Sequence, residues 1–188
     1  MLRRISLLLA GLFCMMSIVA QPAMADTAAT TDASLNLTAG GAITLDQAPD
    51  VDFGTQTISE KAATYTTNLT TPIQVTNPGL QANYTVYATL GNFTAGDRIL
   101  KGAVLTFGTA TPLAKDSDNQ SGVPTTLSNR KLYAGMTGFF SPMMIASPGS
   151  GIGVWQDVIQ SAQLTVPAGN VAGSYHADIT WTMTNAPS

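Results

Sequence analysis

The stretch from Tyr175 to Thr184, near the C-terminus, alternates apolar and polar side chains without interruption. Side chains of a β-strand repeat with a period of two, so every second residue lies on the same face of a sheet. The apolar face would carry Tyr175, Ala177, Ile179, Trp181 and Met183, and the opposite face would carry His176, Asp178 and the threonines. The pattern predicts a half-buried strand with its aromatic and aliphatic face against a core.

Shorter segments of the same kind recur upstream, each closed by Gly, Pro or Asn. They are rich in β-branched and aromatic residues, and no window has a sustained helical period with caps. The predicted strands are 35–37, 42–45, 73–76, 84–90, 103–107, 132–136, 162–166 and 175–184. These strands, in a chain of ordinary domain length, predict an all-β fold: a single antiparallel β-sandwich with Greek-key-like topology over residues 35–188.

Two segments break the alternation and are predicted to be loops. Residues 109–126 are polar and rich in Ser, Asp, Asn and Gly, whereas residues 139–154 carry Pro142, Met143, Met144 and three glycines. The segment 139–154 has two possible roles. It either covers an open edge of the core or packs on a partner, because Met side chains adapt to irregular surfaces.

Residues 1–25 have the organisation of an export signal, or signal peptide. Arg3 and Arg4 precede an apolar run, and Ala23 and Ala25 frame a small-residue cleavage site. The run is shorter than the roughly 20 apolar residues of a membrane-spanning helix, so we expect a secreted protein with no membrane insertion after signal cleavage. Residues 26–34 are predicted to form a flexible lead.

Composition limits the chemistry of the mature domain. Cys14 is the only cysteine and falls inside the signal, after a bulky Phe13 that disfavours lipid attachment, so no disulfide is expected. A formal net charge of −3 with no basic run argues against nucleic acid and anionic membranes as partners. Charged residues make up 10% of the chain, against a usual share of about 25%, so Thr, Ser and Asn cover the surface instead.

A set of landmarks runs through the chain in order. An aromatic-x-aliphatic triplet occurs twice, as Tyr84-Thr-Val86 and as Trp181-Thr-Met183. The other landmarks are Val51-Asp-Phe53-Gly54, Ile73-Gln-Val75, Phe93, Leu100-Lys-Gly102, Trp155, Leu164-Thr-Val166-Pro167 and Gly173-Ser-Tyr175. In this order they resemble the WxL domain, a surface module of low-GC Gram-positive bacteria, from about residue 35 to residue 187.

The resemblance implies a non-catalytic β domain that attaches non-covalently to the cell wall, with peptidoglycan as the first candidate among the wall polymers. It also implies partners, namely other WxL proteins and a membrane-anchored protein with a WxL-interacting region. Residues 185–188 carry no sortase-like signal, which agrees with non-covalent retention. The family motif is Trp-x-Leu at both positions, so Tyr84 with Val86, and Met183 after Trp181, depart from it. Tyr84 lacks the indole donor, which puts a ligand contact there in doubt, whereas Met for Leu is a mild change.

Five residues are tentative ligand or partner contacts. Trp155 is the favoured exposed aromatic, because glycines flank its segment. Met143 and Met144 belong to the apolar loop, and Tyr84 and Trp181 are the motif aromatics. For Trp181 a place in the core competes with a role as ligand platform, since burying a Trp removes roughly 150–250 Å² from water, worth up to about 6 kcal/mol.

No catalytic residue, metal site or cofactor is predicted. His176 and Asp178 have the spacing of a base and its orienter, but no nucleophile motif accompanies them. The run from Asp116 to Gly122 resembles a calcium loop, although its glycine is one position late and Leu127 stands where the twelfth-position Glu belongs. At most a weak surface calcium site remains.

The favoured hypothesis is therefore a non-catalytic protein of the cell surface and cell wall. The alternative is a pilin-like or spore-coat-like subunit that assembles by strand addition, because Val166 to Gly169, Gly173 to Tyr175 and the terminal strand also resemble such subunits. Those proteins usually carry a disulfide. A secreted enzyme is the third class, and the chain lacks a recognisable catalytic motif for it.

Overall fold

The computed structural model describes residues 30–186, and every regular element in that range is a β-strand. The prediction of an all-β fold is confirmed. The chain divides into two compact units, residues 1–36 and 37–188, and all strands belong to the second. The predicted export signal with Cys14 lies outside the described residues, as do residues 26–29 of the predicted lead. Among the described residues no helix is long and apolar enough to cross a membrane.

The strands form three four-stranded antiparallel sheets and one small hairpin. The first sheet has the order β1 (Thr44–Gln47), β3 (Ile73–Asn77), β12 (Gly153–Ile159) and β8 (Ala110–Ala114). The second has the order β10 (Lys131–Tyr133), β7 (Val104–Phe107), β13 (Ser161–Val166) and β2 (Ala63–Asn68). The third has the order β14 (Ile179–Ala186), β4 (Asn83–Leu90), β11 (Ser141–Ala146) and β9 (Thr125–Thr126), and the hairpin pairs β5 (Thr94–Ala95) with β6 (Arg98–Ile99).

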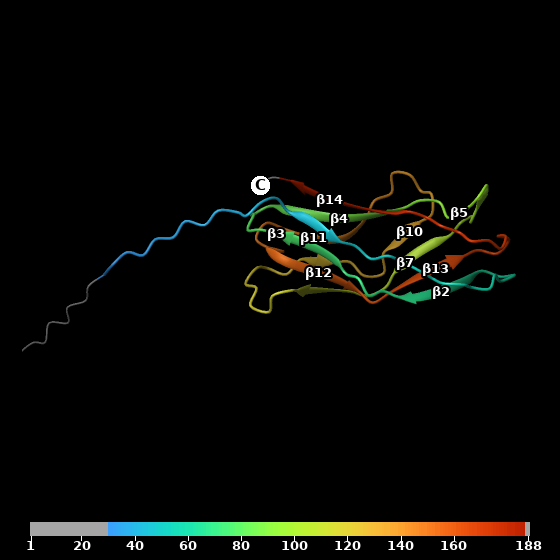
Figure 1. Cartoon of the computed structure of the whole chain (residues 1–188), viewed down its shortest axis with the longest axis horizontal. Coiled ribbons are helices and arrows are strands. Elements are labelled where there is room, and N and C mark those ends of the chain that lie inside the picture. Colours follow the sequence, from blue (N-terminus) through green and yellow to red (C-terminus); the bar gives the residue numbers. More distant parts are fainter. Residues whose placement is uncertain (1–29, 187–188) are drawn as a thin grey trace, which may run out of the picture. The chain divides into compact units, whose positions relative to one another are not determined.

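The first and second sheets are consecutive halves of one layer. β2 leads into β3, β7 into β8, and β12 into β13 through connections of one to four residues. Backbone hydrogen bonds cross the junction, for example from Gly108 N to Ser161 O (2.8 Å) and from Gln160 N to Thr109 O (3.2 Å). The third sheet supplies the opposite layer: Figure 1 shows β14 and β4 along one side and β12, β13 and β2 along the other. The result is the expected antiparallel sandwich.

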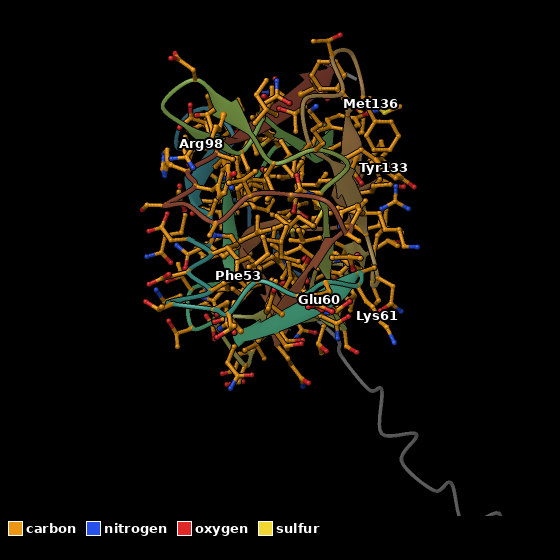
Figure 2. The ribbon with its side chains drawn as sticks, turned by 90° about the vertical axis from the view of Figure 1, so that its right-hand side faces the viewer. Phe53, Glu60, Lys61, Arg98, Tyr133 and Met136 are labelled. Carbon is orange, nitrogen blue, oxygen red and sulfur yellow. The ribbon has the colours of Figure 1, made fainter. Side chains whose placement is uncertain are left out.

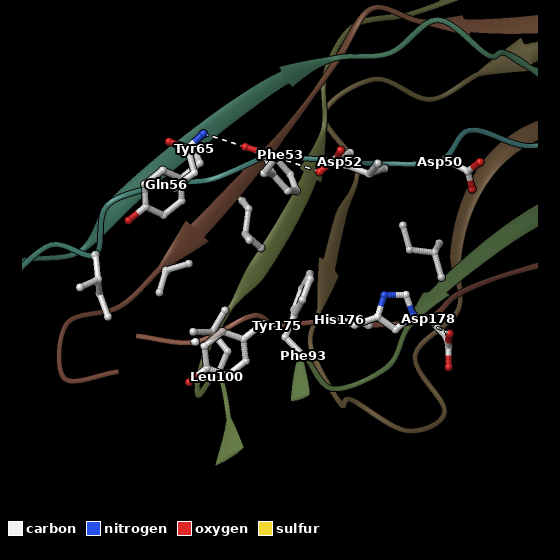
Figure 3. A pocket seen from close by; sticks show the side chains of 18 of the residues that line it. Asp50, Asp52, Phe53, Gln56, Tyr65, Phe93, Leu100, Tyr175, His176 and Asp178 are labelled. Atoms are coloured by element: carbon white, nitrogen blue, oxygen red, sulfur yellow. Dashed lines mark hydrogen bonds and ion pairs between the residues drawn. The ribbon is translucent and has the colours of Figure 1, made fainter. Parts of the chain in front are cut away.

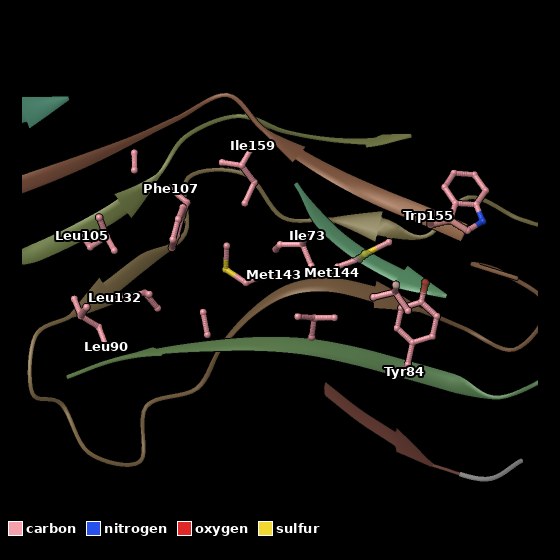
Figure 4. Close-up of a cluster of buried hydrophobic side chains, with 14 of the residues drawn as sticks. Ile73, Tyr84, Leu90, Leu105, Phe107, Leu132, Met143, Met144, Trp155 and Ile159 are labelled. Atoms are coloured by element: carbon pink, nitrogen blue, oxygen red, sulfur yellow. The ribbon is translucent and has the colours of Figure 1, made fainter. Parts of the chain in front are cut away.

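The core fills the space between the layers. On β4 every second residue is buried, as a strand with one face inward requires, and Tyr84, Val86, Ala88 and Leu90 form that face. Phe107, Leu105 and Leu132 meet it from the second sheet (Figure 4). The described residues contain no cysteine, so this burial, worth about 1.5–3 kcal/mol for each large apolar side chain, is the main stabilising contribution.

The prediction of a loop over residues 139–154 was wrong. The segment contains β11 and the first part of β12. A β-bulge between Pro142 and Met144 shifts the register against β4, and Met143 and Met144 are both fully buried. Because a bulge places two successive side chains opposite one partner residue, it destroys the alternation by which a strand is recognised in sequence.

Other boundaries also differ from the prediction. Residues 109–126 contain the whole of β8 and of β9, residues 35–37 form no strand, and the strand predicted over 132–136 ends at Tyr133. The regular terminal strand begins at Ile179 rather than at Tyr175, because a one-residue register shift interrupts the pairing before Ile179. Beyond this shift the segment runs beside the residues that follow β4: Gly91 N donates to Asp178 O (2.9 Å), and His176 exchanges two backbone hydrogen bonds with Thr94 (2.8 and 2.9 Å). The predicted apolar face is confirmed, because Tyr175, Ala177, Ile179, Trp181 and Met183 are partly buried and the residues between them are exposed.

Three polar side chains are buried in the domain: Asn77, Ser141 and Asp157. The Asn77 amide bonds both backbone groups of Leu80 (2.8 and 2.9 Å), and Ser141 Oγ accepts a hydrogen bond from Arg130 Nε (3.2 Å). Neither carboxyl oxygen of Asp157 has a hydrogen-bond partner among the described residues. Burial raises the pKa of Asp157 to about 7.

Candidate functional site

A groove of about 680 Å³ opens between residues 48–58 and residues 171–179, two stretches without regular strand pairing except the bridge at His176. Its walls carry five aromatic side chains: Phe53, Tyr65, Phe93, Tyr175 and Trp181. Leu100, aliphatic residues of β13 and β14, and apolar residues of both flanking stretches, among them Val51, Ile58 and Val171, complete its apolar lining. Figure 3 shows Phe53 on one side, facing Phe93 and Tyr175 on the other.

A tight turn fixes Phe53 on the first wall. Asp52 Oδ1 accepts a hydrogen bond from Gly54 N (2.8 Å), and Gln56 Nε2 donates to Phe53 O (2.7 Å). Gly54 has φ +60°, a conformation that favours glycine because a Cβ would be strained there. The Asp-Phe-Gly sequence thus holds the Phe53 ring half-buried at the groove.

The two tyrosine hydroxyl groups of the walls are already engaged within the protein. Tyr175 Oη donates to Val171 O (2.8 Å), and Tyr65 Oη donates to Thr57 O (2.9 Å). Both hydrogen bonds tie an aromatic ring to a segment of irregular backbone. They fix the walls and use the phenol protons that a ligand acceptor would otherwise bind.

Trp181 reaches the groove from β14. Its ring is half-buried and lies 5.6 Å from the ring of Phe107, inclined at 55°. One part of the indole therefore packs on the core while another part lines the groove. Trp181 thus has the position expected of a core residue and, at the same time, the exposure that a ligand contact requires.

Three carboxylates, those of Asp50, Asp52 and Asp178, lie among the groove-lining residues, with His176. His176 Nε2 is 3.4 Å from Asp178 Oδ1, and the two side chains are 86% and 90% exposed. Within residues 30–186 no Lys or Arg side chain lines the groove. The charged lining is therefore acidic, apart from any proton on His176.

Four of the five tentative contact residues are buried. Tyr84 is 1% exposed, Trp155 is 5% exposed, and Met143 and Met144 are fully buried. The Trp155 indole donates to Ile152 O (3.0 Å) and Ser121 Oγ (3.2 Å), so its polar end is satisfied inside the fold. The expectation that Trp155 is the more exposed tryptophan was wrong: it is Trp181 that reaches a solvent-accessible groove.

Tyr84 is held in a space that leaves no room for a larger ring. Its hydroxyl group lies 3.5 Å from Gly151 O, and a Cβ added to Gly151 would collide with that hydroxyl. Burial raises the pKa of Tyr84 above its ordinary value. Val86, the other residue of this motif, is fully buried, and Met183 is half-buried against the core. The first motif therefore lies inside the sandwich.

Many of the sequence landmarks meet at the groove, although Tyr84-Thr-Val86, Ile73-Gln-Val75 and Trp155 do not. Its lining includes Val51-Asp-Phe53-Gly54, Phe93, Leu100, Leu164, Val166, Gly173, Tyr175, Ile179 and Trp181. These residues are far apart in the chain, and the sequence offered no measure of their proximity. Phe53 and Tyr175 were not singled out as contacts, although their glycine-flanked positions were a usable signal.

The described residues give little support for a metal site. Within residues 30–186 no group of three or more His, Cys, Asp or Glu side chains is placed to hold a metal ion. In the calcium-like run, Asp116 Oδ1 accepts from Asp118 N (3.0 Å) and Asn119 Oδ1 from Ser121 N (2.8 Å). These side chains therefore stabilise their own turns.

A second aromatic feature lies outside the groove. The aromatic patch consists of Tyr87, Tyr133, Met136, Phe139 and Phe140. Phe140 packs edge-on against Tyr87 (6.4 Å between ring centroids), and Phe139 packs against Tyr133 (5.6 Å). Phe140, Met136 and Tyr133 are 57%, 52% and 41% exposed. Figure 2 shows Tyr133 and Met136 together, well apart from Phe53 at the groove.

Comparison with known proteins gives one match. The family described as WxL domain, surface cell wall-binding, matches residues 21–187 of the chain. No curated protein and no solved structure matches it.

Proposed function

We propose that this chain, which belongs to the WxL domain family of surface cell wall-binding proteins, is a secreted, non-catalytic protein that attaches non-covalently to peptidoglycan. The observation that carries the proposal is the aromatic groove, where many of the sequence landmarks lie, among them Phe53, Tyr175 and Trp181. Aromatic rings in a concave site suit the apolar faces of sugar rings, and a few polar groups beside them orient a ligand. The polymer would lie across the groove between Phe53 and Tyr175.

A non-catalytic role is supported by the environment of His176 and Asp178. Both side chains are almost fully exposed, and they form only a loose pair at 3.4 Å. A general base works best when burial and fixed partners tune its pKa and hold it against the substrate. Binding rather than hydrolysis is the activity that this geometry favours.

Co-sedimentation with purified sacculi tests the proposal. The mature protein is expected to pellet with sacculi, and Phe53→Ser is expected to weaken binding about three- to tenfold, as for the loss of one aromatic stacking contact. Leu113→Ser is the matched control, because Leu113 is an apolar residue, 52% exposed, on β8 outside the groove. Equal loss in both variants, or no sedimentation of the wild type, would contradict the proposal.

The aromatic patch supports a second contact, with another surface protein. Tyr, Phe and Met are enriched at protein interfaces, and an exposed cluster of them is uncommon on a monomer. We propose that this patch binds another WxL protein or a membrane-anchored WxL-interacting protein.

Phe140→Ser is expected to reduce co-purification of such a partner from cell-surface extracts at least tenfold, since exposed aromatic anchors contribute about 2 kcal/mol or more at interfaces. Sacculus binding by the same variant should be unchanged. Val123→Ser, at a residue 62% exposed outside the patch, serves as control. Partner recovery that is the same for both variants would assign the contact to another surface.

A further inference from the structure

Among the side chains that line the groove, the Asp carboxylates are acceptors, and several side-chain donors are already used within the protein. The hydroxyl protons of Tyr65 and Tyr175 are donated to backbone carbonyls, and the Gln56 amide donates to Phe53 O. Asp52 uses Oδ1 for the Gly54 turn, which leaves Oδ2 toward solvent. The carboxylates of Asp50 and Asp178 add further acceptors. A ligand that satisfies this lining must bring donors.

The charge of the lining also favours a ligand that carries hydrogen-bond donors, in particular a cationic one. Asp50, Asp52 and Asp178 are among the residues that line the groove, with the Asp178 side chain 90% exposed, and among residues 30–186 no Lys or Arg belongs to the lining. Arg98 Nη1 donates to the carbonyl of Ala172 (3.0 Å), but its side chain is not part of the lining. Figure 3 shows Asp50, His176 and Asp178 toward the same end of the groove. A cationic group placed there would be attracted, and an anionic one repelled.

The aromatic walls limit which cationic ligands with hydrogen-bond donors would fit the groove. Phe53 and Tyr175 are partly buried and lie on opposite sides of the groove, and Trp181 also belongs to its lining. Such walls hold flat, partly apolar rings, and a cation over an aromatic face is attracted as well. A pyranose ring that carries hydroxyl groups and an ammonium group meets all three requirements of the groove.

We infer that the groove binds a glycan whose amino sugars carry free amino groups, with Asp52 and Asp178 as the acceptors that distinguish an amine from an acetamide. The inference rests on the proposed wall attachment and specifies its ligand. N-acetylation removes the positive charge and two of the donors of the amino group and adds bulk. The carboxylates of the groove therefore favour de-N-acetylated over fully acetylated glycan.

Isothermal titration calorimetry with two sets of oligosaccharides tests the inference. Glucosamine oligomers are expected to bind the mature protein at least about fivefold more tightly than N-acetylglucosamine oligomers of the same length, as for one partly exposed ion pair. The preference should shrink as salt is added, because exposed charges are screened.

Side-chain variants test which carboxylates cause the preference for glucosamine oligomers. Asp52→Asn and Asp178→Asn are expected to weaken binding of glucosamine oligomers about three- to fivefold and to leave N-acetylglucosamine oligomers unaffected. In Asp52→Asn the amide oxygen of the new side chain would still accept from Gly54 N, so the turn is retained. Asp118→Asn, at an exposed acid outside the groove, is the control and should change neither affinity.

Equal affinity for the two oligomers, or loss of preference in Asp118→Asn as well, would overturn the inference. Tighter binding of a tri-lysine peptide than of glucosamine oligomers would also overturn it and assign the groove to a basic peptide. These results are separable from wall attachment. If the wild type pellets with sacculi and Phe53→Ser does not, while neither oligomer is preferred, the proposed function stands and the amine selectivity falls.

Discussion

Replacing Asp157 with Asn is expected to raise the free energy of unfolding at neutral pH by about 4 kcal/mol, because the pKa of this buried carboxyl is raised from 3.8 to about 7. Asp157 lies on β12 and is fully buried, with Ile73 and Pro112 opposite it on the neighbouring strands. Neither of its oxygens has a hydrogen-bond partner among the described residues. An ionised carboxylate at this position is desolvated without compensation.

The sign of the pH dependence follows from proton uptake. Between pH 3.8 and about 7 the folded protein holds a proton on Asp157 that the unfolded chain has released. The unfolded state binds fewer protons in this range, so the contribution of Asp157 to stability falls as the pH rises. It is fully present below the unfolded pKa and is lost once the pH passes the folded pKa.

Urea unfolding of the wild type and of Asp157→Asn, at about pH 4 and at about pH 8, measures this effect. The stability difference between the two proteins should be small at the lower pH and near its maximum at the higher one. Asp157→Leu should be at least as stable as Asp157→Asn, because it also removes the unpaired polar atoms. Asp118→Asn, at an exposed acid, should leave stability unchanged at both pH values. A difference between wild type and Asp157→Asn that is the same at both pH values would show that Asp157 does not ionise differently on folding.

The sequence patterns predicted several of the strands that bury one face, but not β12, although Trp155, Asp157 and Ile159 alternate there as buried residues. The strand predicted over 73–76 ends one residue later, and β4 and β13 each begin one residue before the predicted start. These strands were recognisable because β-branched and aromatic residues alternate there with polar ones. β11 was missed, since its bulge buries Met143 and Met144 in succession. The threonine-rich β2 was missed as well, since its partly buried positions alternate with polar residues of similar size.

The site was less predictable than the fold. Phe53, Tyr175 and Trp181 are separated by long stretches of chain, and only the pairing of the strands brings them to one groove. Local pattern correctly predicted that Tyr175 and Trp181 share one face, because every second residue from 175 to 183 is partly buried and those between are exposed. Alternation within one segment could not show that Phe53, from a distant part of the chain, would lie across the groove from Tyr175.

The two tryptophans are expected to respond in opposite ways to truncation. Trp155→Ala should cost about 3–5 kcal/mol of folding stability, because it empties a site that is 5% exposed and leaves the Ser121 and Ile152 acceptors without the indole donor. Such a cost is comparable with the whole stability of many domains, about 5–15 kcal/mol. Trp181→Ala should cost about half as much, since its ring is only half-buried, but it removes part of the groove.

Urea unfolding and sacculus sedimentation on the same preparations separate the two roles. Trp181→Ala should remain folded and lose most of its binding, whereas Trp155→Ala should lose binding only in proportion to its unfolded fraction. Trp155→Phe, which restores an aromatic ring to the core, should recover both folding and binding, while Trp181→Phe should recover binding in part. If folded Trp155→Ala fails to bind while Trp181→Ala binds normally, the contact lies near β12 and not in the groove. The reason to expect the first result is geometric: the Trp155 indole is closed off by its own hydrogen bonds, and only the Trp181 indole contacts both the core, through Phe107, and the groove.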